Sequence, residues 1–115
     1  MKDFKPFLRH IVDECRFIEE AIKDKEYEDF ISDETLKRAV VRSLEVIGEE
    51  AKSLPADLKQ RYEDIPWRKI AGLRDVLIHQ YFGVDYANVW KIATEEVSRL
   101  RRRVEEILRE VSSQA

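Results

Sequence analysis

The chain has 115 residues, of which 39% are charged and 43% are apolar, and its formal net charge is −3 at pH 7. This length predicts a single domain over residues 1–115 with one hydrophobic core. Because the net charge is negative, the protein as a whole does not attract polyanions. RNA binding would therefore require a local basic patch. The single cysteine, Cys15, excludes an internal disulfide framework and a multi-cysteine zinc site.

No apolar run approaches the ~18 residues of a membrane span. Charged residues at Arg9, Asp13 and Glu14 interrupt the N-terminal region, which therefore does not resemble a signal peptide. We expect a cytoplasmic protein that does not associate with membranes. With only 3 Gly and 3 Pro, the composition is typical of a helical protein with solvated charged faces.

The first predicted helix covers about residues 5–25. Residues 24–32 break the helical period, so we expect a loop there that holds Tyr27 and Phe30 against the rest of the protein. His10 falls at the boundary of the apolar stripe, and Cys15 lies on it as a core residue. The stripe consists of Phe7, Leu8, Ile11, Val12, Cys15, Ile18 and Ile22.

The second predicted helix covers about residues 34–53 and begins at Ser32-Asp33-Glu34, a helix-start signal. Gly48 lies inside it and costs ~1 kcal/mol relative to alanine, which indicates the close approach of another helix. That helix could belong to the same chain or to a second subunit, and both interpretations stay open. The main apolar stripe consists of Leu36, Val40, Leu44, Ile47, Ala51 and Leu54.

Two further helices are predicted to begin at prolines, which suit the first helical position. Pro55 begins a short helix that extends to about residue 62. Pro66 begins a fourth helix that ends near His79, with Gly83 as its stop signal.

The last predicted helix covers residues 86–111, with Asp85 as its N-terminal cap. Its apolar residues recur at spacings of four and three without a break, which is typical of a seam that packs against other long helices. Together with the broad apolar face of the second helix, the seam predicts a homodimer. The seam consists of Tyr86, Trp90, Ala93, Val97, Leu100, Val104, Ile107 and Val111.

Arg74, His79 and Tyr81 bring three chemically useful side chains within eight residues. Histidine exchanges protons near neutral pH, and arginine binds phosphate with paired donors, so the two suit metal-free phosphodiester chemistry. On a regular helix Arg74 and His79 would diverge by ~140°. They could share a phosphate only if the helix ends near His79 or if two chains combine their motifs. The alternative is a histidine held by a neighbour at the end of a core helix.

Other charged residues could contribute to phosphodiester chemistry or RNA binding. Asp75 precedes His79 by four residues and could orient its imidazole, or the two could form an ordinary helical pair. The last predicted helix carries a group of arginines that could follow an RNA backbone or form salt bridges on a solvated face. These arginines are Arg99, Arg101, Arg102 and Arg103.

The spacing of Arg74, His79 and Tyr81 resembles the Arg-x-x-x-x-His-x-Tyr signature of the HEPN superfamily. Three longer stretches are similar to its HepT-like branch, so the resemblance extends from about residue 43 to Trp90. These stretches are residues 44–51, residues 65–75 and residues 79–85.

The resemblance implies an all-α fold, an up-and-down bundle of four to five helices that forms a homodimer with the two motifs facing across a cleft. It implies the toxin of a type II-like toxin–antitoxin system, an endoribonuclease that acts on tRNA or mRNA and needs no metal or cofactor. Arg74 and His79 would be catalytic, and Tyr81 would position RNA, while the spacing of Asp75 to His79 would allow Asp75 an orienting role beside them. The cognate antitoxin would be a minimal nucleotidyltransferase that silences the toxin by attaching AMP to Tyr81.

Two alternatives remain at this point. The first is a non-catalytic helical subunit that binds a nucleotidyltransferase or a nucleotide, although proteins of that kind tend to lack the Arg–His signature present here. The second is a dimerising bundle with no catalytic role.

Overall fold

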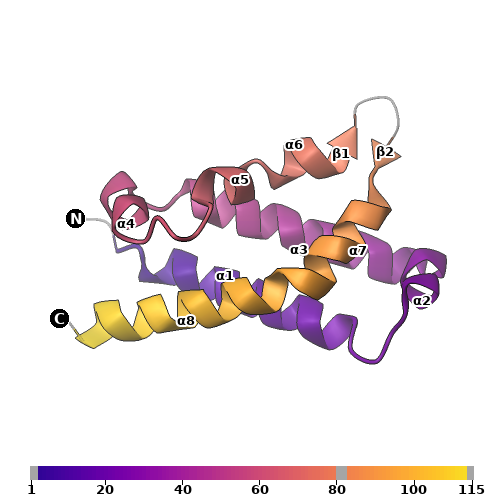
Figure 1. The fold of residues 1–115 in the computed structure, drawn as a ribbon, viewed down its shortest axis with the longest axis horizontal. Coiled ribbons are helices and arrows are strands. Elements are labelled where there is room, and N and C mark those ends of the chain that lie inside the picture. The colour runs from indigo at the N-terminus through magenta and orange to yellow at the C-terminus, as the bar shows by residue number, and fades with distance from the viewer. Residues whose placement is uncertain (1–2, 80–82, 114–115) are drawn as a thin grey trace.

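The computed structural model of the chain describes residues 3–79 and 83–113. Within these ranges four helical passes run alternately in opposite directions, and the first and last passes meet at one end of the bundle (Figure 1). This confirms the predicted all-α, up-and-down architecture. The elements are α1 (Lys5–Ala21), α2 (Tyr27–Ser32), α3 (Glu34–Lys52), α4 (Ala56–Arg61), α5 (Trp67–Ala71), α6 (Leu73–Leu77), β1 (Ile78–His79), β2 (Gly83–Val84), α7 (Tyr86–Glu95) and α8 (Val97–Ser113).

Helix α1 packs against both α3 and α8, and these three helices form most of the core. The apolar stripe of α1 is buried from Leu8 to Ile18, and Cys15 is fully buried within it. Phe7 is only partly buried, and α1 ends at Ala21, so Ile22 lies just beyond the helix and is also partly buried. Burial of apolar side chains is the main stabilising contribution in a domain of this size. Fully buried core residues include Leu8, Ile11, Ile18, Val40, Val104 and Ile107.

The predicted loop over residues 24–32 is correct only for residues 24–26, because a short helix, α2, forms from Tyr27 to Ser32. Tyr27 and Phe30 pack against the rest of the protein as predicted. The N-terminus of α2 is stabilised by a reciprocal cap in which Glu26 and Asp29 each bind the other's backbone. Phe30 is fully buried, and its ring packs against Trp90, with centroids 5.1 Å apart. The helix has too few residues to show a period, and its stability comes from these contacts with α7.

Helix α3 begins where the sequence predicts, because the Asp33 carboxylate accepts a hydrogen bond from the Leu36 amide at 3.0 Å. Gly48 approaches the backbone of α5, so the neighbouring helix belongs to the same chain. Both predicted proline starts are displaced by one residue. Pro55 and Pro66 are the residues that precede α4 and α5 rather than their first residues.

The fourth predicted helix is two short helices, broken at Gly72, and it ends at Leu77. The Asp85 amide donates a 2.7 Å hydrogen bond to the Leu77 carbonyl, which satisfies an acceptor at the helix end. Ile78 then pairs with Val84 in a two-stranded antiparallel ladder. Gly83 lies in β2 with φ of +78°, so its predicted role as the stop of this helix is wrong.

The last predicted helix is interrupted at Glu96 and changes direction there (Figure 1). Helix α7 packs against α1, α2, α3 and α6, whereas α8 packs mainly against α1. The change in direction therefore lets α7 reach elements that α8 does not contact as closely. Asp85 caps α7 as predicted, since its carboxylate accepts from the Asn88 amide at 3.1 Å. Val97, Val104, Ile107 and Val111 of the predicted seam are buried in the core of the chain itself.

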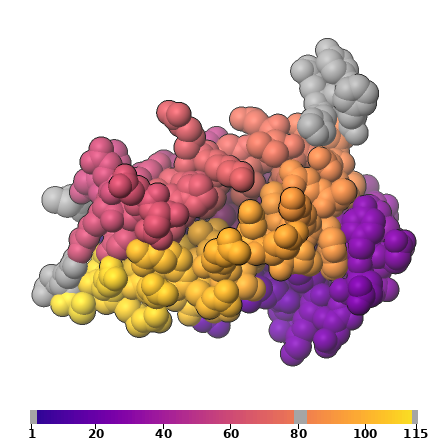
Figure 2. Space-filling model, viewed as in Figure 1, coloured from indigo at the N-terminus to yellow at the C-terminus, as the bar shows by residue number. Residues whose placement is uncertain are grey.

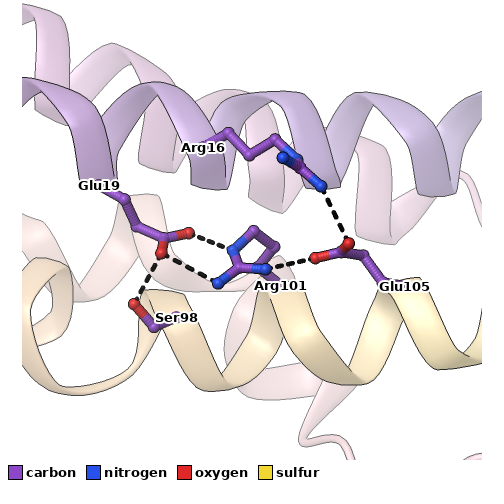
Figure 3. Close-up of polar contacts among 5 residues, drawn as sticks. All are labelled: Arg16, Glu19, Ser98, Arg101 and Glu105. Carbon is purple, nitrogen blue, oxygen red and sulfur yellow. Dashed lines mark hydrogen bonds and ion pairs between the residues drawn. The ribbon is translucent and has the colours of Figure 1, made fainter.

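A polar network joins α1 to α8 (Figure 3). The Arg101 guanidinium donates to the carboxylates of both Glu19 and Glu105. Arg16 donates to Glu105 at 2.9 Å, and the Ser98 hydroxyl donates to Glu19 at 3.0 Å. Several partly buried charges that share partners stabilise a helix pair more than isolated surface pairs do.

None of the helices in the described ranges combines the length and the apolar composition needed to cross a lipid bilayer.

Candidate functional site

Arg74 is the second residue of α6, which packs against α3. Leu73 and Leu77 are buried and hold this short helix on the core. The Arg74 side chain points outward instead and is 71% exposed. Val76 is 47% exposed, which is unusual for an apolar side chain of this size in the described part of the chain. An exposed arginine therefore stands on a well-anchored helix, next to an exposed apolar residue.

Glu45 of α3 is the charged neighbour of Arg74. Its Oε2 atom lies 3.9 Å from the Arg74 Nε, and its side chain is only 18% exposed. The same Oε2 atom lies 3.9 Å from Nη1 of Arg42. Arg42 also donates from Nη1 to Glu49 at 3.4 Å. The sequence resemblance includes Glu45, but sequence reasoning assigned it no role, because its proximity to Arg74 depends on how α3 and α6 pack.

His79 lies in β1, two residues beyond the end of α6, and its backbone pairs with Gly83. Arg74 and His79 therefore do not lie on one continuous helix, and the divergence expected for a regular helix does not apply. The helix does end near His79, which was one of the two conditions for a shared phosphate. The His79 side chain and residues 80–82, which include the predicted site residue Tyr81, lie outside the described part of the structure.

Asp75 is exposed on α6 beside Arg74. The predicted pairing of Asp75 with His79 assumed a spacing of four residues on one helix. That geometry is wrong, because α6 ends at Leu77 and residues 78–79 are extended. Any contact between the two side chains would have to form across this change in backbone direction.

An apolar groove of about 420 Å³ lies between the α5–α6 pass and the α7–α8 pass. Figure 2 shows that these two passes cover most of α3 on this face. Val76 lines the groove, two residues from Arg74, and Leu44 and Ile47 of α3 also contribute to it. Charged residues of both signs accompany the apolar lining, among them Asp64, Lys69, Lys91, Glu96, Arg99 and Arg103.

The group of four arginines near the start of α8 is divided between two environments. Arg101 belongs to the network with Glu19, and Arg103 donates to Asp64 at 2.7 Å. These two confirm the salt-bridge interpretation, although their partners lie on other segments as well as on α8. Arg99 and Arg102 are exposed. The other histidine, His10 of α1, has its Nδ1 atom 3.3 Å from a Glu50 carboxylate oxygen.

The chain matches the sequence profile of the family described as "Ribonuclease HepT-like" over residues 11–107. It is 47% identical over 108 residues to a protein provisionally named RNase TTE0752 from Caldanaerobacter subterraneus subsp. tengcongensis, covering 94% of this chain and 96% of that protein. It is 44% identical over 110 residues to the provisionally named RNase MJ1216 of Methanocaldococcus jannaschii, covering 96% and 91% of the two chains.

A third relative is the probable ribonuclease HepT of Thermococcus cleftensis, which is 40% identical over 106 residues, or 92% of this chain and 96% of that protein. No solved structure matches the chain with statistical significance. The helical fold is that of an HEPN-type protein. Within that class, the chain belongs to the HepT-like ribonuclease family.

Proposed function

We propose that this protein is a metal-independent endoribonuclease whose catalytic residues are Arg74 and His79. The observation that carries the proposal is the exposed guanidinium of Arg74 on a helix that ends two residues before His79. Membership of a ribonuclease family supports RNA as the substrate, as do the names of the relatives.

In the proposed reaction, the 2′-hydroxyl of one nucleotide attacks the adjacent phosphorus. His79 acts as the general base that takes the hydroxyl proton, or as the general acid that protonates the leaving 5′-oxygen. Arg74 stabilises the negative charge that develops on the phosphoryl oxygens. The P–O5′ bond breaks, and the products carry a 2′,3′-cyclic phosphate and a free 5′-hydroxyl. Tyr81 positions the RNA by a hydrogen bond or by stacking on a base.

The working form in this proposal is a homodimer that brings two motifs to one cleft. The apolar seam of α7 and α8 supports this less than the sequence suggested, because much of it is buried within the chain. The apolar groove between the α5–α6 and α7–α8 passes supports it better. Its lining includes Val76, which is 47% exposed, and Ile92 and Leu100, which are partly buried, and a second copy would cover these side chains. Its charges of both signs are suited to a two-fold interface in which each patch meets its own copy.

The biological role in this proposal is that of a toxin. Its cognate antitoxin is a minimal nucleotidyltransferase, which silences the enzyme by transferring AMP to Tyr81. An AMP group adds bulk and a negative phosphodiester close in sequence to Arg74, where it would compete with RNA for the arginine.

The experiment is incubation of the purified protein with total RNA and with tRNA in EDTA. We expect cleavage that leaves cyclic phosphate ends. Arg74→Ala and His79→Ala should each reduce the rate by roughly 10²–10⁴-fold with the helical circular dichroism unchanged. Matched controls are Arg68→Ala, an exposed arginine on α5, and His10→Ala, the only other histidine. Both controls should cleave at the wild-type rate.

Cleavage by His79→Ala at the wild-type rate would refute the mechanism, and a requirement for added Mg²⁺ would indicate different chemistry. If no preparation cleaves RNA but the protein still binds a nucleotidyltransferase, the non-catalytic partner subunit is the better description.

A further inference from the structure

We propose that Arg42 is a second phosphate-binding residue of the RNA site, held next to Arg74 by their shared contact with Glu45. This inference rests on the proposed function, because it takes the Arg74 surface as the place where RNA binds. It adds a residue of α3 that lies outside the Arg74–Tyr81 motif.

One oxygen atom, Oε2 of Glu45, lies 3.9 Å from Nη1 of Arg42 and 3.9 Å from Nε of Arg74. Both distances are measured to the same atom, so the two guanidinium groups are neighbours although the residues are 32 positions apart in sequence. Glu45 is only 18% exposed, so it is held by the packing of α3 and provides a fixed point between the two arginines.

Both arginines have N–H donors that no ion pair in the described part of the chain uses. A guanidinium has five N–H donors in a planar fork. Among the described residues, Arg42 uses only Nη1 and Arg74 uses only Nε in ion pairs. The Arg42 side chain is 62% exposed and that of Arg74 is 71% exposed, so the remaining donors face solvent. Two exposed forks side by side suit successive phosphates of one RNA strand, which an arginine can bind with paired hydrogen bonds.

Glu49 pairs with Arg42 at 3.4 Å and is 54% exposed. Exposed pairs of this kind contribute little to stability, so a phosphate can replace Glu49 at little cost. Glu49 also keeps the Arg42 charge compensated when RNA is absent. The carboxylate therefore competes with RNA for Arg42, and its removal should strengthen binding.

Helix α3 supplies a matched control for each substitution. Arg38 lies one turn before Arg42, is 79% exposed and pairs with Glu34 at 3.8 Å. Arg38→Ala removes the same charge from the same helix as Arg42→Ala. Glu34→Gln likewise removes the same charge as Glu49→Gln. A general effect of net charge should therefore be the same for both variants in each comparison. A difference in RNA affinity between the two variants would indicate a specific contact.

The test measures the affinity of a single-stranded RNA oligonucleotide at several salt concentrations, in a His79→Ala background that prevents cleavage. We expect Arg42→Ala to weaken binding about tenfold and to reduce the slope of log affinity against log salt by about 0.7, the value for one lost phosphate contact with a single strand. Arg38→Ala should change the RNA affinity and the salt slope by only a small fraction of the changes caused by Arg42→Ala. Glu49→Gln should bind RNA more tightly than Glu34→Gln.

Equal effects of Arg42→Ala and Arg38→Ala would overturn the proposal, as would equal effects of the two glutamine variants. In the cleaving enzyme, Arg42→Ala should raise KM and leave kcat near the wild-type value. A protein that binds RNA through Arg42 but never cleaves it would contradict the proposed ribonuclease function and leave this inference standing. A protein that cleaves RNA with no contribution from Arg42 would support the ribonuclease function and contradict this inference.

Discussion

Gly48 of α3 faces the backbone carbonyl of Ile70 in α5, so closely that a β-carbon on Gly48 would lie 2.9 Å from the Ile70 oxygen. That distance is below any normal contact, and the atom it meets belongs to the main chain, which cannot move aside by rotating a side chain. The absence of a side chain at residue 48 therefore allows α5 to lie directly on α3. Because α6 follows α5 immediately, this contact also determines where Arg74 stands.

Gly48→Ala should destabilise the protein despite the better helix propensity of alanine. Propensity favours alanine by about 1 kcal/mol, whereas overpacking costs about 1–3 kcal/mol, so we expect a net loss of roughly 1 kcal/mol. The control is Gly72→Ala, where φ is −93° and the new β-carbon would lie 3.4 Å from its nearest neighbour. Urea unfolding should show a lower midpoint for the first variant only. A stabilised Gly48→Ala variant would contradict the close packing of α3 and α5.

Cys15 should be unreactive in the folded protein. Burial, together with the nearby Glu19 carboxylate, raises the pKa of the Cys15 thiol to about 12. The reactive thiolate is therefore scarce at neutral pH, and the buried sulfur is shielded from reagents. A disulfide reagent at pH 8 should label the native protein negligibly and label it completely in denaturant. Rapid labelling without denaturant would show that α1 separates from α8 in the native state.

The network around Arg101 should contribute stability that acid removes. The hydrogen bond from Arg101, with further help from Arg16, lowers the pKa of the Glu105 carboxyl below its ordinary value of 4.5. A carboxyl whose pKa is lower in the folded than in the unfolded state stabilises the fold above the unfolded value. That contribution is lost as the pH falls through the folded pKa.

Glu105→Gln should therefore lower Tm most at neutral pH, by the equivalent of about 1 kcal/mol. The difference from the wild type should shrink progressively as the pH falls below 4.5. Glu63→Gln, a charge-matched change at an exposed position, should show no such convergence. A Tm difference that stays constant across this pH range would exclude the Arg101–Glu105 contact as its origin.

Substitution of Val76 should show whether this exposed apolar side chain forms a dimer contact or is only part of an ordinary surface. Val76 and Phe17 are equally exposed, each at 47%, but only Val76 lines the apolar groove between the α5–α6 and α7–α8 passes. We expect Val76→Glu to shift the protein to monomer in sedimentation experiments and to abolish RNA cleavage. Phe17→Glu should leave both unchanged. An active, stable monomer of either variant would contradict the composite site.

Tyr81 should be the residue modified when the protein is produced together with a cognate nucleotidyltransferase. The intact mass should rise by one AMP unit, and peptide mapping should place it on Tyr81. Tyr62 is a natural control, because its hydroxyl donates to Glu110 at 2.7 Å and its side chain is buried. Tyr81→Phe should escape silencing by modification. Adducts found only on Tyr62 or Tyr86 would refute the assignment.

The positions of the four helical passes follow from the sequence because their signals are local. Apolar periodicity marks the buried face of each long helix, and Asp33 and Asp85 cap the helices that follow them. The candidate site residues Arg74 and His79 could be proposed for a similar reason, because their types and spacing lie within one short stretch.

The arrangement around those residues depends on contacts between distant segments, which no local pattern encodes. Helix α2 forms because Phe30 packs against α7, and α6 ends at Leu77 because the Asp85 amide binds its carbonyl. Likewise, Glu45 meets both Arg42 and Arg74 only because Gly48 lets α5, and with it α6, lie against α3. The sequence thus shows the chemical character of each side chain, whereas helix packing determines which residues lie next to it.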